Sequence, residues 1–130
     1  MRAAAIVIKD GKILLIHRFF NGREYYVFPG GGVEKAETTE EATIREMKEE
    51  TSLDVKLARK LWEIHNEFDG RMAVFYLITE FNGTLKLGGS EAEINSKQNK
   101  FILEWHNLKE IHKLPLVPED VKKRVIEEFC

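Results

Sequence analysis

The sequence predicts one α+β domain over residues 1–130, with a mixed β-sheet and helices packed on its faces. Short apolar, β-prone runs separated by turn residues follow one another along much of the chain. Two amphipathic segments, at about residues 38–51 and from residue 118 onward, have the period of a helix. The 43% hydrophobic content is enough for one core, and no repeat or linker divides the chain.

Two apolar runs open the predicted sheet, at residues 3–8 and 13–18. Between them stands Lys9-Asp10-Gly11-Lys12, and Asp-Gly between two β-prone runs is a strong hairpin signal. A short aromatic strand is expected from Tyr25 to Phe28, where Pro29 stops it.

A helix is expected next, from Thr38 to about Thr51. Its first residue is the predicted N-cap, and Glu41, three residues later, completes a capping box. Beyond the helix, residues 53–64 and 71–79 are expected to form paired strands around a turn that contains Asp69-Gly70.

The remaining elements are a loop, a strand and a closing helix. Residues 85–93 are polar and contain glycine, which is typical of a loop, and residues 101–105 favour a strand. Pro118 starts the last helix, because proline suits the first turn. The inner face of this helix is expected to consist of Val121, Val125, Ile126 and Phe129.

Composition excludes several classes of function. The formal net charge is −2, so nothing indicates bulk attraction to a nucleic acid polymer or an anionic membrane. No apolar run approaches the roughly 20 residues of a membrane span, and the charged residues 9–12 make the opening a poor signal peptide. The one cysteine, Cys130, cannot form an internal disulfide, and we expect a cytoplasmic protein.

Three glutamates share one patch of the first predicted helix: Glu46, Glu49 and Glu50. Since successive residues turn by about 100°, this patch lies roughly 140° to 240° from Ile44 on the helical wheel. The expected buried stripe on the opposite side is Ile44, Met47 and Thr51.

The glutamate patch is unfavourable without a cation. Like charges three or four residues apart cost about 0.2–0.5 kcal/mol each, and the wheel places Lys48 and Arg45 away from the patch or at its edge. Crowded carboxylates are what Mg²⁺ or Mn²⁺ requires. The alternative is an ordinary solvated acidic face.

A run of glycines, Gly30-Gly31-Gly32, precedes this helix. Glycine adopts backbone angles closed to other residues, so the loop can fold tightly against the helix. A main-chain carbonyl could then join the carboxylates as a metal ligand, or phosphate oxygens could approach closely. The alternative is a plain turn. Neither the Gly-Lys-Ser/Thr phosphate loop nor Gly-x-Gly-x-x-Gly is present.

The segment from Gly31 to Leu53 resembles the Nudix hydrolase box, Gly-x5-Glu-x7-Arg-Glu-U-x-Glu-Glu-x-Gly-U, in which U is a bulky aliphatic residue. The matching residues are Gly31, Glu37, Arg45, Glu46, Met47, Glu49, Glu50 and Leu53. Ser52 stands in place of the last glycine, which would support a left-handed helix cap. Serine is expected to cost about 1 kcal/mol there, while adding or removing no metal ligand.

The resemblance implies a Nudix-type three-layer α/β/α sandwich with a mixed sheet, and metal-dependent hydrolysis of a pyrophosphate bond in a nucleotide derivative. The implied metal ligands, for Mg²⁺ or Mn²⁺, are Glu46, Glu49, Glu50 and the Gly31 main chain. Glu37 and Arg45 are expected to form a buried ion pair that positions the loop on the helix. The alternative for Arg45 is a surface pair with Glu41.

The general base stays open between Glu46 and a carboxylate of the later loop, Glu91 or Glu93. Substrate contacts are expected from aromatic and charged residues, although core packing or simple exposure is the commoner role of each. These residues are Arg18, Arg23, Tyr25, Phe28 and Glu119. Stacking of an aromatic ring on a base is worth roughly 1–3 kcal/mol. The four histidines have no ligand-like spacing and are expected to be structural or exposed.

Three functions compete at this point. The first, which we favour, is a pyrophosphohydrolase acting on a small nucleotide, with a homodimer possible. The second is a nucleotide-binding sensor without turnover, which the departure at Ser52 hints at, and the third is an interaction domain whose acidic helix is structural. Nucleoside triphosphates and nucleotide sugars both remain candidate substrates. In "LPLVPEDV", Glu119 and Asp120 offer carboxylates that can read the edge of a guanine.

Overall fold

The computed structural model describes residues 1–65, 70–88 and 99–130. Its strands are β1 (Arg2–Lys9), β2 (Lys12–Phe20), β3 (Arg23–Val27), β4 (Gly30–Gly32), β5 (Asp54–His65), β6 (Met72–Asn82), β7 (Asn99–Asn107) and β8 (Leu116–Val117). Its helices are α1 (Thr39–Thr51), the short 3₁₀ helix η1 (Leu108–Lys113) and α3 (Glu119–Phe129).

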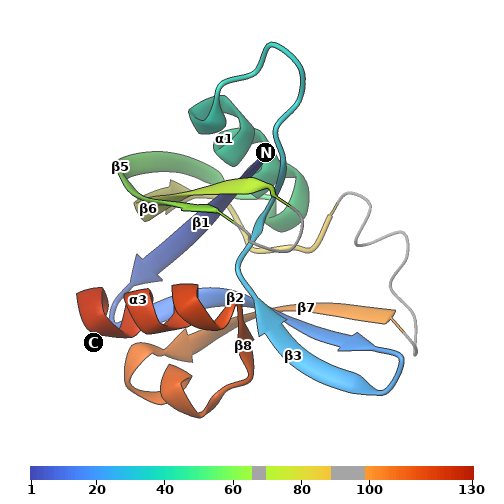
Figure 1. The fold of residues 1–130 in the computed structure, drawn as a ribbon, viewed down its shortest axis with the longest axis vertical. Helices are drawn as coiled ribbons and strands as arrows, with labels where there is room; N and C mark the ends of the chain where they lie inside the picture. The colour runs from blue at the N-terminus through green and yellow to red at the C-terminus, as the bar shows by residue number, and fades with distance from the viewer. Residues whose placement is uncertain (66–69, 89–98) are drawn as a thin grey trace.

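The strands form one mixed sheet in the order β5-β6-β1-β2-β3-β8, with β4 paired to β1 and β7 paired to β2. β1 runs parallel to β6 and antiparallel to β4 and β2. The sheet is strongly curled: β5, β6 and the start of β1 make one half, and β2, β3 and β7 make the other (Figure 1). The predicted α+β class with a mixed sheet is therefore confirmed.

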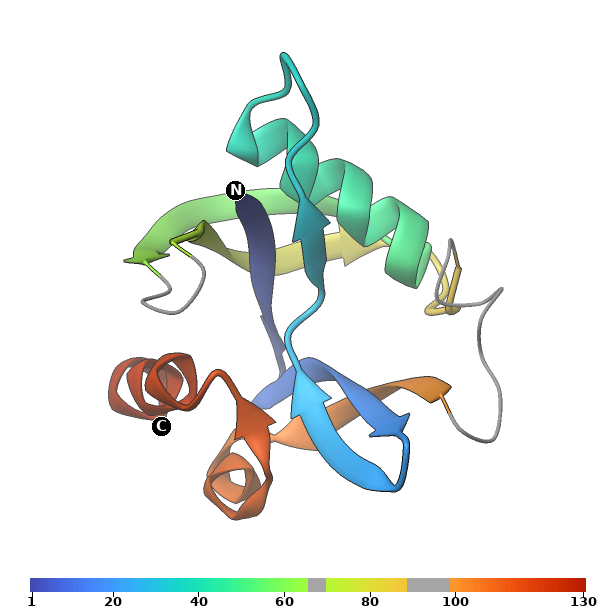
Figure 2. The ribbon, with the colours of Figure 1, turned by 45° about the vertical axis from the view of Figure 1, so that its right-hand side comes forward.

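Helices cover both faces of the half that contains β5, β6 and β1. Figure 2 shows α1 on one side of these strands and α3 on the other. β1 serves both sides, because Ala4 and Ile6 pack in the core shared with α3, whereas Ala5 and Val7 pack in the core shared with α1. A strand buried on both faces has to be apolar throughout, which explains the uninterrupted run at residues 3–8.

The first hairpin prediction and the strand pairing of the second are confirmed, whereas Asp69 of the second predicted turn lies outside the described residues. β1 and β2 pair across the turn with Ile8 opposite Ile13, and β5 and β6 pair antiparallel along their length. The glycine run, expected to be a loop, is instead the strand β4, with Gly30 opposite Ala4. A side chain at Gly30 would collide with the backbone of β1. The strand therefore forms at that distance only because the residue is glycine.

The capping box of α1 is present as predicted. The Thr38 hydroxyl accepts a hydrogen bond from the Glu41 N–H at 3.1 Å, and the Glu41 carboxylate accepts one from the Thr38 N–H at 2.9 Å. The C-cap after the helix is Ser52, which has the left-handed conformation expected of the missing glycine, with φ 66°.

The predicted buried stripe of α1 is wrong in part, because Ile44 is 43% exposed. Its buried residues are Ala42, Thr43, Met47, Glu50 and Thr51. The helix is turned so that the glutamate side approaches β4, and the two elements are in contact. The helical wheel correctly predicted that Met47 and Thr51 are buried together. It could not predict on which side of the helix β4 would lie.

The closing helix begins after Pro118, as predicted, and buries Val121 and Val125 completely, with Ile126 and Phe129 packed beside them. The short elements η1 and β8 were not predicted. β8 joins β3 through only two residue pairs, which is too short for an alternating pattern. Within the described ranges, no helix is long and apolar enough to cross a membrane.

Candidate functional site

The glutamate side of α1 lies directly against the glycine strand β4. A Cβ on Gly31 would overlap the carboxyl group of Glu46, so any other residue here would displace that carboxylate from its present position. One residue earlier, the Gly30 N–H donates a hydrogen bond of 2.7 Å to Oε1 of Glu50. The structure therefore brings together two of the predicted carboxylates and the predicted glycine, and it adds Gly30, which the sequence did not distinguish from its neighbours.

Arg45 connects the glutamates to the glycine strand. Its Nε and Nη2 donate to the two carboxylate oxygens of Glu37, at 2.7 and 2.9 Å. Nη1 donates to Glu46 at 2.9 Å and to Glu49 at 3.1 Å, and Nη2 also donates to the Gly32 carbonyl at 2.9 Å. The expectation that no cation pairs with the glutamate patch is wrong. The Arg45 side chain is long enough to reach the carboxylates of Glu46 and Glu49 from its own position on the helical wheel.

The ion pair expected between Glu37 and Arg45 is present, and both side chains are largely buried, at 13% and 23% exposure. Hydrogen bonds from Arg45 and, secondarily, from the Glu34 N–H lower the pKa of Glu37 to about 2. The hydrogen bond to Glu37 raises the pKa of Arg45 in turn. The pair is therefore fully charged at neutral pH. The alternative pairing with Glu41 is replaced, because the Glu41 carboxylate caps the helix.

The three predicted metal ligands occupy different environments. Glu50 is buried, the side chain of Glu46 is 15% exposed, and that of Glu49 is 51% exposed. Carboxylate oxygens are the donors that Mg²⁺ prefers, so the donor chemistry fits a divalent ion. In this arrangement the Arg45 guanidinium holds Glu46 and Glu49, and no group of three or more His, Cys, Asp or Glu side chains in the described residues converges on a metal position.

A cleft of about 740 Å³ lies beside this site. It opens between β1, β3, the adjoining ends of β5 and β6, and the start of α3. Its lining residues are Arg2, Ala4, Val27, Phe28, Ile64, His65, Arg71, Met72, Ala73, Phe75, Val117, Pro118, Asp120 and Val121. Phe28 packs edge-on against Phe75, with ring centroids 6.0 Å apart. The apolar wall with few charged groups suits a flat organic group.

The cleft and the glutamate site share a short stretch of chain. Phe28 lines the cleft, and Gly30, two residues later, contacts Glu50. On the neighbouring strand, Arg2 and Ala4 line the cleft and pair with Gly32 and Gly30 of β4. The pairing of β1 with β4 therefore connects the lining of the cleft to the glutamate site.

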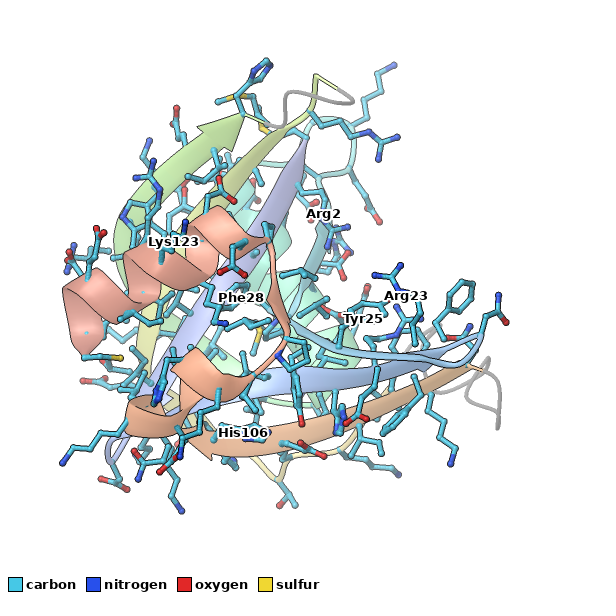
Figure 3. The ribbon with its side chains drawn as sticks, turned by 60° about the horizontal axis from the view of Figure 1, so that its bottom comes forward. Arg2, Arg23, Tyr25, Phe28, His106 and Lys123 are labelled. Atoms are coloured by element: carbon cyan, nitrogen blue, oxygen red, sulfur yellow. The ribbon has the colours of Figure 1, made fainter. Side chains whose placement is uncertain are left out.

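The predicted substrate residues are not all in one place. Phe28 lines the cleft, but Arg18, Arg23 and Tyr25 lie on β2 and β3 outside its lining. Figure 3 shows Arg23 and Tyr25 together on one part of β3, with Phe28 nearer to α3. The Arg18 guanidinium lies 3.8 Å from the ring centre of Phe101, and in the described part of the chain its buried Nε has no hydrogen-bond partner.

Two further predictions concern carboxylates. The cleft lining contains Asp120 but not Glu119, which precedes it in the first turn of α3. The sequence had offered both, and helix geometry alone could not choose between neighbours. Glu91 and Glu93, the loop candidates for the general base, lie outside the described residues.

The family profile of the NUDIX domain matches residues 1–129. The chain belongs to the Nudix family. This confirms the resemblance carried by the Nudix box, and the fold agrees with it. The structure of MutT from Aliivibrio salmonicida and Vibrio cholerae superposes with a TM-score of 0.78 over 98% of this chain and 97% of that one, at 23% identity.

Similar Nudix proteins include enzymes. The CTP pyrophosphohydrolase of Escherichia coli is 30% identical over 122 residues, which cover 91% of this chain and 83% of that protein. The ADP-ribose pyrophosphatase of Methanocaldococcus jannaschii is 37% identical over 94 residues, 68% of this chain and 55% of that protein. The solution structure of the E. coli ORF135 protein matches with a TM-score of 0.72, at 28% identity, over 98% of this chain and 86% of that one. With the family match, these relatives support a Nudix-type pyrophosphohydrolase.

Proposed function

We propose that the protein hydrolyses a pyrophosphate bond in a nucleoside di- or triphosphate derivative, with a divalent metal ion. The observation that carries this proposal is the continuity between the cleft and the carboxylates, through Phe28 and Gly30. A nucleoside in the cleft would lay its phosphates along β4. The side chain missing at Gly31 leaves the Glu46 carboxylate close to that path.

Glu46, Glu49 and Glu50 would hold Mg²⁺ or Mn²⁺, together with the main chain at Gly30 or Gly31. When bound, the ion neutralises phosphate charge and acidifies an attacking water. Glu50 is already oriented by the Gly30 N–H, whereas Glu46 and Glu49 must exchange part of their contact with Arg45 for the ion.

Arg45 and Glu37 act on the geometry of the site rather than on the phosphorus. The pair joins the helix to the strand, because Arg45 contacts both Glu37 and the Gly32 carbonyl. Such supporting contacts typically change metal affinity or activity by 10- to 100-fold when lost. We infer that the pair holds β4 at the distance the carboxylates need.

Two positions are assigned to the general base. Glu46 is one, since a carboxylate next to the phosphate path can accept a proton from water. A loop glutamate, Glu91 or Glu93, is the other. The pH dependence of kcat in Glu46→Gln and Glu93→Gln separates the two, because losing the base removes the acidic limb of the profile.

The cleft and the relatives support a proposal for the substrate class. The apolar wall around Phe28 fits a nucleobase, and Asp120 adds an acceptor to the lining. Enzymes named for CTP and for ADP-ribose are both similar to this chain. We therefore propose nucleoside triphosphates and nucleoside diphosphates linked to a sugar as the candidates.

Purified protein with Mg²⁺, tested at mildly alkaline pH against nucleoside triphosphates, oxidised dGTP, dinucleoside polyphosphates, ADP-ribose and nucleotide sugars, checks the proposal. Hydrolysis of one substrate that Glu50→Gln abolishes and Glu127→Gln leaves intact supports it, since Glu127 is exposed on α3. No turnover of any compound would contradict it. A nucleotide that raises the melting temperature yet stays intact would instead identify a sensor.

A further inference from the structure

The last turn of α1 is hydrogen-bonded to the segment that follows β6, residues 83–88. The Lys86 N–H donates to the Thr51 carbonyl at 2.9 Å, and the Gly88 N–H donates to the Glu50 carbonyl at 3.0 Å. The last carbonyls of a helix have no partner within the helix. The segment therefore supplies two of the missing donors, next to residues proposed to hold the metal.

Glycine makes the closest of these approaches possible. A Cβ on Gly88 would lie 2.5 Å from the carbonyl oxygen of Glu49, so any other residue would push the segment away from the helix. Gly83, at the start of the segment, has φ 111° and lies against the Ser52 carbonyl. The segment thus follows the helix end closely at both of its glycines.

Ser52 holds the same segment from the other side. Its own N–H caps the helix by donating to the Lys48 carbonyl at 3.1 Å, and its hydroxyl donates to the Lys86 carbonyl at 2.9 Å. Lys86 is therefore held through both its N–H and its carbonyl. The glycine that the Nudix box has at this position could provide the cap but not the hydroxyl.

We propose that Ser52 is a positioning residue for the metal site. Its hydroxyl clamps Lys86 against the last turn of α1, and this fixes the main chain from which Glu49 and Glu50 project. The inference rests on the proposed function only in assigning the metal to these glutamates. It gives the serine a role in the site, where the sequence indicated the strain of a left-handed residue and a hint of lost turnover.

Amide hydrogen exchange tests the clamp without any turnover. Ser52→Gly keeps the left-handed cap but removes the hydroxyl, and exchange at the Lys86 and Gly88 amides should become about two- to fivefold faster, as for one lost hydrogen bond. The Tyr76 amide, in β6 between β5 and β1, is the internal control and should not change. Unchanged exchange at Lys86 and Gly88 would overturn the clamp.

Binding of Mn²⁺, followed by electron paramagnetic resonance, tests the positioning. Ser52→Gly should weaken Mn²⁺ binding about two- to fivefold and raise by a similar factor the Mg²⁺ concentration for half-maximal hydrolysis. Its melting temperature should be equal or higher, because glycine relieves the left-handed strain. Ser52→Asn, which tolerates that conformation and keeps a donor, should restore much of the affinity.

The outcomes separate the two proposals. Faster exchange with unaltered Mn²⁺ affinity would overturn the positioning role, and a lower melting temperature matching the loss of affinity would show a merely structural one. A wild-type protein that binds Mn²⁺ but hydrolyses no nucleotide would contradict the proposed function. The exchange and Mn²⁺ measurements on Ser52→Gly would still decide the clamp in that case.

Discussion

Glu37 and Arg45 form a two-pronged ion pair, with Nε to Oε2 at 2.7 Å and Nη2 to Oε1 at 2.9 Å. The same guanidinium also reaches two of the three glutamates proposed to bind metal. One arginine thus organises both the strand and the helix of the site. A charged pair in this position has consequences for stability and for activity that can be measured separately.

The stability that Glu37 contributes near neutral pH should be lost at acidic pH. The Arg45 hydrogen bonds hold the pKa of Glu37 at about 2, below its ordinary value of 4.5. A lowered pKa contributes stability above the ordinary value and loses it as the pH falls, here between about 4.5 and 2. Urea unfolding of wild type and Glu37→Gln should therefore differ near neutral pH and converge over that window. A constant difference would contradict the pairing.

Replacing Arg45 by lysine should reduce activity although the charge is kept. One ammonium group cannot reproduce the guanidinium contacts to Glu37, Gly32 and the glutamates. We expect kcat/KM to fall about 10- to 100-fold. The matched control is Arg59→Lys, because Arg59 pairs with Glu128 at the surface and should be neutral. Equal activity of both variants would show that Arg45 is only a surface cation.

Metal binding should depend on the glutamates individually. Calorimetric titration with Mg²⁺ should show affinity reduced at least 10-fold in both Glu49→Gln and Glu50→Gln, since each loses a charged ligand. The control, Glu127→Gln, removes an exposed carboxylate from α3. Unchanged affinity in the first two variants, with equal or higher stability from eased repulsion, would favour a structural acidic helix.

The sequence predicted local features better than relations between elements. The capping box, the left-handed residue at position 52 and the Asp-Gly hairpin depend on a few neighbouring residues, and all three are present. The burial of Glu50 and the exposure of Ile44 depend on where β4 packs against the helix. The periodicity of the helix sequence carries no information on that position. The cleft joins residues from both ends of the chain, and of its lining only Phe28 and Asp120 were named beforehand as possible substrate contacts.

His17 should contribute to stability through its ring nitrogens. Nε2 lies 2.8 Å from Glu24 and Nδ1 lies 2.9 Å from Glu104, while the ring stacks on Tyr26 at 4.1 Å. His17→Phe keeps the stacking and removes both hydrogen bonds, so urea unfolding should show a loss of about 1–2 kcal/mol. His112→Phe, at an exposed position, should change stability by less than about 0.5 kcal/mol.

The same variant should alter the acid response of Glu104. Burial acts to raise the pKa of Glu104, but hydrogen bonds from His17 and His106 outweigh it and lower that pKa. A lowered pKa gives stability above the ordinary carboxyl value, which disappears as the pH falls. The difference between wild type and His17→Phe should therefore shrink on acidification below about pH 4.5. A difference that grows instead would exclude this charge pairing.

Substrate selection should depend on Asp120 more than on Glu119, because only Asp120 belongs to the cleft lining, although both stand in the first turn of α3. Asp120→Asn turns a pure acceptor into a group that also donates, which alters the match to a nucleobase edge. With the substrate found in the screen, KM should rise about 10-fold for Asp120→Asn, as for one lost charged hydrogen bond, while kcat changes little. Glu119→Gln is the matched variant and should keep the wild-type KM. A larger rise in KM for Glu119→Gln than for Asp120→Asn would assign the recognition to Glu119. A fall in kcat alone would place Asp120 near the reacting phosphate rather than near the nucleobase.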